Sequence, residues 1–148
     1  METIGAYKAR FLAGPMTWAF CIGEMQELRE AIAERDAAHA WEEWNDVTLC
    51  LLAWASEHFP VLGWMPILPG LGLLSAEKFA ARISVWEDIF EHHGVQFRKE
   101  HLFAGSNYRK AHKVVRVLGL GGVEESDVDL EWVEKRVGGF EPGPGGTV

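Results

Sequence analysis

Two long, neighbouring segments of the chain carry apolar residues at every third or fourth position, the period of a helix that packs on one side. The first runs from residue 17 to about residue 35, and the second from about residue 37 to residue 58. Pro15 suits the first turn of the first helix, and Asp36 is a possible N-cap of the second. Because the connection between them is so short, we expect the two helices to form an antiparallel hairpin.

The segment that follows, residues 60–74, is strongly apolar but contains three prolines and three glycines. This composition excludes a regular α-helix. Its large apolar side chains would be costly to leave in water. We therefore expect the segment to pack across the helices or into an interface between subunits.

Three further helices and a tail are expected in the rest of the chain. The expected helices cover residues 75–93, about 107–118 and about 127–137, with N-caps at Ser75, at Ser106 or Asn107, and at Ser126 or Asp127, and with Gly94 ending the first of them. Residues 138–148 are rich in glycine and proline and are expected to form a disordered or loosely attached tail. No stretch alternates as a strand would, so the predicted class is all-α, an antiparallel helical bundle in one domain over residues 1–137.

Length and charge limit the partners that the chain can take. Its 148 residues suit one domain, and its formal net charge is -8. This charge repels a nucleic-acid polymer, whereas a single nucleotide can still bind to an acidic pocket loaded with divalent cations. No segment approaches the roughly 18 uninterrupted apolar residues of a membrane span, and the N-terminus lacks the pattern of a secretion signal. We therefore expect no polymer and no membrane as partners, and a cytoplasmic location.

The most informative pattern is a pair of acidic residues in each long helix. Glu24 and Glu27 are spaced i,i+3 in the first helix, and Glu43 and Asp46 in the second, so each pair lies on one helical face. In a hairpin the pairs face each other, and four carboxylates beside apolar residues repel one another unless a cation is bound. Hard oxygen ligands favour magnesium, with manganese also suitable. Taken singly, each acid is better explained by a solvated helix face, and it is the apolar neighbours of the two pairs that favour a cation site.

These residues resemble a known family, the all-α nucleoside triphosphate pyrophosphohydrolases, which include the MazG proteins, dimeric dUTPases and phosphoribosyl-ATP pyrophosphohydrolase. The family pattern is ExxE followed by ExxD, and here EMQELREAI is followed by EEWNDV. Lys78 and Phe79 with Arg82 are similar to the KFxxR stretch of MazG domains. The resemblance covers residues 17–93 and implies a MazG-like fold, magnesium at the four acids, and phosphate contacts from Lys78 and Arg82. Two solvated surface cations are the alternative for this basic pair.

The residue that would activate water is less well marked. The family often has a further acid directly before the first ExxE, and Gly23 occupies that position here. Glu42 adjoins Glu43 but points about 100° away around the helix. It is our candidate for orienting the attacking water, and a solvent-facing position is the alternative.

Candidate substrate contacts lie outside the acidic pairs. The segment of residues 106–116 is the most basic part of the chain, and Asn107, Arg109, Lys110 and Lys113 are candidates for contacts to phosphate or ribose. Pairing with acids of a partner subunit explains this segment equally well. Trp18 is the candidate for stacking on a base, with core or subunit packing as the alternative.

The predicted activity is that of a magnesium-dependent nucleotide pyrophosphohydrolase, which cleaves a nucleoside or deoxynucleoside triphosphate between its α- and β-phosphates. Its products are the monophosphate and pyrophosphate. The alternative is a non-catalytic helical module that senses nucleotides or binds another protein through residues 60–74. The resemblance, together with the many large apolar residues on the hairpin, predicts a homodimer or homotetramer.

Overall fold

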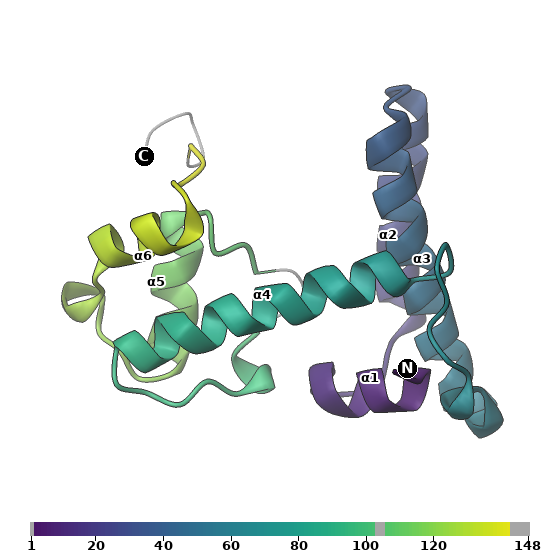
Figure 1. Cartoon of the computed structure of the whole chain (residues 1–148), viewed down its shortest axis with the longest axis horizontal. Helices are drawn as coiled ribbons and strands as arrows, with labels where there is room; N and C mark the ends of the chain where they lie inside the picture. The colour runs from purple at the N-terminus through teal and green to yellow at the C-terminus, as the bar shows by residue number, and fades with distance from the viewer. Residues whose placement is uncertain (1, 103–105, 143–148) are drawn as a thin grey trace. The chain divides into compact units, whose positions relative to one another are not determined.

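The computed structural model describes residues 2–102 and 106–142. Over these residues the regular structure is helical, with one isolated antiparallel bridge between Thr3 and Pro66 and no strand (Figure 1). The elements are α1 (Ile4–Phe11), α2 (Trp18–Ala33), α3 (Ala37–His58), η1 (Pro60–Trp64), α4 (Leu73–His92), η2 (Lys99–His101), α5 (Ala111–Leu120), η3 (Glu125–Asp127) and α6 (Leu130–Val137), where η denotes a 3-10 helix. The predicted all-α class is confirmed. In the described ranges, no helix combines the length and apolarity that crossing a membrane requires.

The chain divides into two compact units, residues 1–81 and residues 82–148. The first unit contains α1, α2, α3, η1 and the beginning of α4. The second contains the rest of α4 and the elements that follow it. Because α4 is continuous through the boundary, this division does not test the predicted single domain, which stays a prediction.

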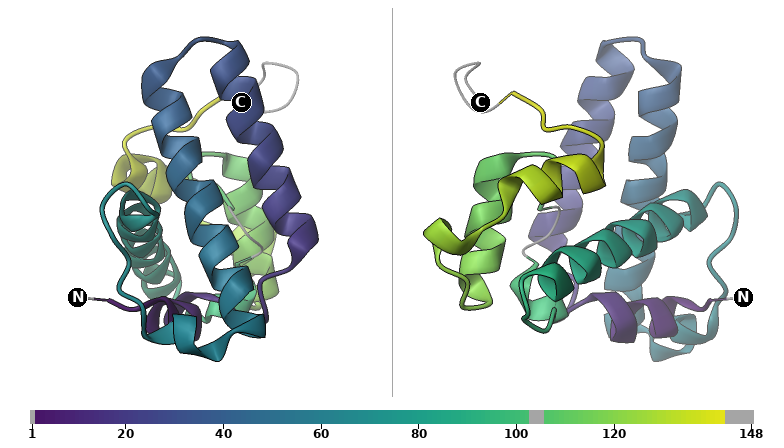
Figure 2. Two further views of the ribbon diagram at one scale, coloured as in Figure 1. Left: turned by 90° about the vertical axis from the view of Figure 1, so that its right-hand side faces the viewer. Right: turned by 60° about the vertical axis from the view of Figure 1, so that its left-hand side comes forward.

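The hairpin expected from the two long apolar patterns is present in the first unit. Helices α2 and α3 lie side by side and antiparallel (Figures 1 and 2). Asp36 caps α3 as predicted, because its side chain accepts a hydrogen bond from the His39 backbone N–H at 3.1 Å. The N-cap of α2 is Thr17, whose hydroxyl accepts from Phe20 N–H. The expectation for Pro15 was wrong, since it precedes this cap and lies outside the first turn.

The two hairpin helices are buried to very different extents. Helix α3 buries a broad face, which consists of Asn45, Val47, Thr48, Leu49, Cys50, Ala53 and Ser56. Helix α2 buries only Cys21 and Ala31. Its outer positions include Ile22 and Ile32, which are 42% and 60% exposed. The hairpin therefore keeps an uncovered apolar face in the isolated chain.

Helix α1 was not expected from the sequence. It begins at the N-cap Thr3, whose hydroxyl accepts from the Ala6 backbone N–H at 3.1 Å. Its buried residues are Ile4, Tyr7 and Phe11, a helical spacing that also packs Tyr7 and Phe11 against the ring of Phe79. The helix is two turns long, and the exposed residues between these positions obscure its pattern.

Residues 60–74 contain no α-helix before Leu73, in agreement with their glycines and prolines. Only part of the segment packs within the chain. Ile67 is 1% exposed, whereas Val61 and Trp64 in η1 are 74% and 83% exposed. Ile67 therefore packs within the chain as expected, whereas Val61 and Trp64 do not pack across the helices, and their expected alternative, an interface between subunits, stays a prediction.

Helix α4 begins two residues earlier than expected. Gly72 precedes it with φ at 110° and donates its backbone N–H to Asn45 Oδ1 at 3.1 Å. This turn sets the first helical residue at Leu73. The predicted N-cap at Ser75 was wrong, since Ser75 lies inside the first turn and its hydroxyl donates to the Asp46 carboxylate. At the other end, Gly94 has φ at 72°, as expected of a glycine that ends a helix.

The second unit is built around one apolar cluster. Its buried members come from α4, α5 and α6, and they are Trp86, Ile89, Phe90, Val114, Val117, Leu118, Val133 and Val137. Trp86 also donates its indole N–H to the backbone oxygen of Ser106 at 3.3 Å. These contacts explain why the short helices α5 and α6 are stable where they pack against α4.

The caps predicted for the last two helices were wrong. Asn107 uses its side-chain oxygen to accept from the Arg109 backbone N–H, which forms a turn, and α5 begins only at Ala111. Ser106 is buried before this turn, at 2% exposure. Ser126 and Asp127 lie in η3, and the N-cap of α6 is Asp129, which accepts from Trp132 N–H.

The tail expected from residue 138 onward is attached in its first part. Gly138 ends α6 in the left-handed conformation, with φ at 82°. Phe140 packs against the apolar cluster of the second unit, and Glu141 N–H donates to the Arg109 backbone oxygen at 2.7 Å. Residues 138–142 therefore contact the second unit through Phe140 and Glu141, and the expected looseness of the tail stays a prediction. Residues 143–148 lie outside the described part.

Candidate metal centre

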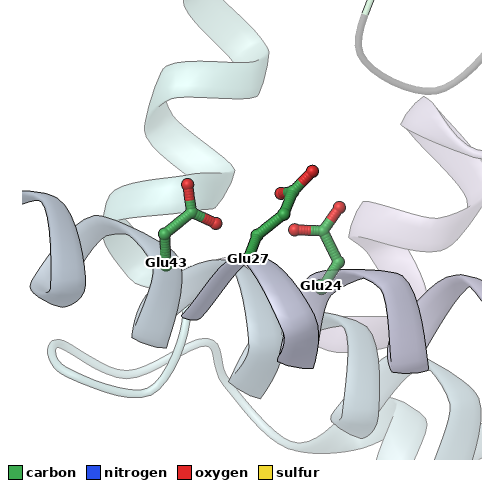
Figure 3. Close-up of side chains that lie close together, drawn as sticks. All are labelled: Glu24, Glu27 and Glu43. Atoms are coloured by element: carbon green, nitrogen blue, oxygen red, sulfur yellow. The ribbon is translucent and has the colours of Figure 1, made fainter. Parts of the chain in front are cut away.

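The hairpin gathers three of the four predicted metal ligands. Glu24 and Glu27 lie one turn apart on α2, and Glu43 lies on the facing part of α3. One carboxylate oxygen from each residue lies within 4.8 Å of the other two. Figure 3 shows the three side chains gathered on one side of the two helices. These three residues are called the acidic cluster below.

Glu24 is the residue most affected by this arrangement. Partial burial is the largest cause that raises its pKa from 4.5 to about 8. The charges of Glu27 and Asp46 and a hydrogen bond with Glu27 raise the pKa further. At neutral pH, without a cation, Glu24 therefore holds a proton.

Glu43 has one satisfied and one unsatisfied oxygen. His39, one helical turn earlier, bonds through Nε2 to Oε1 at 3.1 Å. Oε2 is buried and has no hydrogen-bond partner among the described residues. Burial and the charges of Asp46 and Glu27 raise the pKa of Glu43, while His39 partly opposes this change. A buried carboxylate oxygen without a donor is costly, and a bound cation would remove that cost.

Asp46 lies outside the group of three but close to it. Its charge contributes to the raised pKa values of both Glu24 and Glu43. Its carboxylate accepts a hydrogen bond from the hydroxyl of Ser75 at the start of α4. The structure therefore brings three predicted ligands together and places the fourth as their electrostatic neighbour.

Glu42 and Lys78, predicted to act in catalysis, pair with each other. Lys78 Nζ lies 2.9 Å from Glu42 Oε1, and both side chains are about half exposed. Neither belongs to the acidic cluster. Arg82, the third predicted catalytic residue, is partly buried and belongs to the second unit.

The predicted substrate contacts fall into two groups. Trp18 is the first residue of α2, is 46% exposed, and has its ring 4.9 Å from that of Trp54. The basic group lies in the second unit, where Asn107 and Arg109 share the turn before α5, Lys110 is the N-cap of α5, and Lys113 lies in its first turn. Their role in binding substrate stays a prediction.

Two residues beside the site were missed in the sequence. His39 stands four residues before Glu43, a helical spacing that could have identified it as a partner of that carboxylate. Ser75 lies 29 residues from Asp46 along the chain, and its hydroxyl was assigned to a helix cap. Local spacing gives no signal for such a distant contact.

The three carboxylates of the acidic cluster, among them Glu24 and Glu43 with raised pKa values and the unsatisfied buried oxygen of Glu43, form a set of hard oxygen donors. Such donors suit magnesium or manganese, which binding sites of this kind hold through carboxylates while several water ligands remain. No protein-family model, curated protein or solved structure matches the chain in the comparisons with known proteins. The assignment of chemistry therefore depends on the site itself and on the sequence resemblance.

Proposed function

We propose that the chain is a magnesium-dependent nucleotide pyrophosphohydrolase. The observation that carries the proposal is the acidic cluster, in which Glu24, Glu27 and Glu43 place carboxylate oxygens within 4.8 Å of one another. Holding these oxygens together costs free energy in the metal-free chain, as the raised pKa of Glu24 reflects. A site that is unfavourable until a cation arrives supports a metal-binding role.

The residues that would hold the cation are Glu24, Glu27 and Glu43, with Asp46 as the neighbouring fourth acid. A divalent cation bound there would lower the pKa of a coordinated water and offset charge on the substrate phosphates. The bond broken lies between the α-phosphorus and its bridging oxygen to the β-phosphate. Pyrophosphate leaves and the monophosphate gains the oxygen of water. The resemblance of the ExxE and ExxD pairs supplies this choice of reaction.

Basic residues have supporting roles in the proposal. Lys78 and Arg82 match the KFxxR stretch and would stabilise the leaving pyrophosphate. Trp18, on the hairpin that carries the acidic cluster, would stack on the base. The contacts of Asn107, Arg109, Lys110 and Lys113 to the nucleotide stay a prediction from the sequence. Glu42 would orient the attacking water, and to do so it must exchange its ion pair with Lys78 for a contact to water.

Pyrophosphate release from a panel of nucleoside and deoxynucleoside triphosphates tests this function and identifies the preferred base. The panel is run with magnesium, with manganese and with a chelator. Changing Glu43→Gln should reduce release at least about 100-fold, since it removes a charged metal ligand. Glu30→Gln is the matched control, because Glu30 is an exposed acid of α2 outside the cluster. Full turnover by Glu43→Gln, with unchanged helical circular dichroism, would contradict the proposal.

A non-catalytic interaction module is the second candidate. The exposure of Val61 and Trp64 in η1 favours it, because a surface of this kind suits a protein partner. Thermal shifts with nucleotides, measured with and without magnesium, separate the two candidates. The enzyme should be stabilised by the nucleotide only when magnesium is present. A module that binds proteins through η1 should show no such dependence.

A further inference from the structure

Three consecutive residues of α3 bond to the turn that precedes α4 and to its first helical turn. Trp44 donates its indole N–H to the backbone oxygen of Gly70 at 2.8 Å. Asn45 accepts the Gly72 backbone N–H at 3.1 Å. Asp46 accepts the hydroxyl proton of Ser75. A candidate metal ligand is thus one of three neighbouring anchors for the same segment.

The middle anchor is rigid. Asn45 is completely buried, and its amide nitrogen donates to the Trp41 backbone oxygen at 3.0 Å while its oxygen accepts from Gly72. Both ends of the amide are therefore used, which leaves one favourable orientation for the side chain. The turn is therefore held by a buried side chain whose orientation is fixed by hydrogen bonds at both ends.

The same turn packs against α3 without room for a side chain. A Cβ atom added at Gly72 would lie 2.9 Å from Leu49 Cβ, and its φ of 110° favours glycine. The close approach of the two backbones fixes where α4 starts relative to α3. It therefore also fixes the position of Ser75, three residues further on.

Ser75 is well placed to orient the carboxylate of Asp46. It is only 7% exposed and lies in the first turn of α4, where its hydroxyl has a single proton to donate. That proton goes to Asp46, one turn along α3 from Glu43. Hydrogen bonds to ligating carboxylates commonly decide their orientation and the affinity for the metal.

We propose that Ser75 is a positioning residue for Asp46, and that the anchored Gly70–Ser75 turn sets the geometry of the fourth acid at the metal site. The inference rests on the proposed function, because that function makes Asp46 a ligand or close neighbour of the bound cation. It assigns Ser75 no contact with substrate. The loss of its hydroxyl should weaken metal binding without removing any ligand.

The test measures Mn²⁺ binding to the full chain by electron paramagnetic resonance. Ser75→Ala should weaken binding about 10-fold or more, in the range found when partners of metal ligands are removed. Ser75→Thr retains the hydroxyl and should restore most of the affinity. Ser56→Ala is the matched control, because Ser56 is equally buried in α3 and its hydroxyl donates to the Ala53 backbone oxygen. It should leave Mn²⁺ affinity unchanged.

A metal-independent measurement completes the test. Urea unfolding of Ser75→Ala, Asp46→Asn and the double variant, without metal, forms a double-mutant cycle. Direct pairing predicts that the double variant is less destabilised than the sum of the single variants. Additive effects, or unchanged Mn²⁺ affinity of Ser75→Ala beside a wild-type chain that binds Mn²⁺, would overturn the inference and leave the proposed function standing. A wild-type chain that binds no Mn²⁺ would instead overturn the proposed function, and with it the assigned role of Ser75 in metal binding.

Discussion

Glu24 is a carboxylic acid that folding shifts towards its neutral form. Its pKa is about 8 in the folded chain, against an ordinary value of 4.5. The folded state therefore binds more protons than the unfolded state between these two values, and stability decreases as the pH rises through that window. The contribution of Glu24 to the free energy of unfolding is most favourable below pH 4.5 and is lost above pH 8. A structural acid that served in an ion pair would show the opposite trend.

Glu24→Gln should stabilise the metal-free chain at pH 8.5, because the substitution removes a partly buried negative charge from beside Glu27. We expect a gain of about 1–2 kcal/mol after allowing for screening by solvent at this half-exposed group. At pH 4 the gain should nearly vanish, since the wild-type residue is then protonated in both states. Urea unfolding at the two pH values measures the difference. Glu30→Gln, at an exposed acid on the same helix, is the matched control.

Metal binding at the acidic cluster should release a proton at neutral pH. Carboxylates bind a cation in their ionised form, and Glu24 is protonated in the metal-free chain at pH 7. We therefore expect release of about one proton per bound cation, and an affinity for Mn²⁺ that rises between pH 6 and pH 8. Calorimetry in two buffers that differ in ionisation enthalpy measures the proton count. An affinity that is flat over this range would exclude Glu24 as a ligand.

At the scale of helices and turns, glycine has opposite effects on the stability of the chain at two positions, Gly23 and Gly72. Gly23 lies away from the ends of α2 and is exposed to solvent, and a Cβ atom added there would meet nothing within 4 Å. Gly72 has a left-handed φ and lies against Leu49. The same residue type is therefore a cost to helix stability at the first position and a requirement of the backbone at the second.

Gly23→Ala should stabilise the chain by about 0.5–1 kcal/mol, because alanine restricts the unfolded chain and fits the helix. Gly72→Ala should destabilise it by about 1–3 kcal/mol, through backbone strain and the contact with Leu49. The two variants serve as controls for each other in urea unfolding. A Gly72→Ala variant as stable as the wild type or more stable would refute the close approach of the turn to α3.

At the scale of the whole molecule, the first unit exposes many large apolar side chains to solvent. Large apolar side chains remain exposed on α2, α3 and η1, and they include Trp18, Ile22, Ile32, Trp41, Trp44, Val61 and Trp64. Single exposed apolar residues are common on protein surfaces, but so many on one hairpin and its neighbouring segment are typical of an interface. This distribution supports the expected homodimer or homotetramer.

Ile22→Lys should shift the chain towards the monomer, because it places a charge on the exposed face of α2. Sedimentation velocity across a range of concentrations measures the change. Leu120→Lys is the matched control, since Leu120 is 48% exposed but belongs to α5 in the second unit. A wild-type chain that sediments as a monomer at all concentrations would contradict the predicted assembly.

Sequence reasoning succeeded where neighbouring residues decide the structure. The two long helices and the Asp36 cap follow from periodicity and capping over a few residues. Sequence reasoning failed for α1, whose apolar pattern spans only two turns. It also failed for the N-caps of α5 and α6, because Asn107 forms a turn before α5 and Asp129, not Ser126 or Asp127, caps α6. Several polar residues could serve as a cap at each of those places, and packing selects among them.

The sequence by itself determined that Glu24 and Glu27 share one helical face and that a short connection folds α3 back towards them, because helix period and loop length are local properties. Only the tertiary structure decided which oxygens converge, which of them lacks a donor, and that Ser75 bonds to Asp46. These outcomes depend on how segments distant in sequence pack, and on the burial that packing produces. The proton on Glu24 follows from the same cause, since desolvation between helices raises its pKa more than any neighbour along the chain.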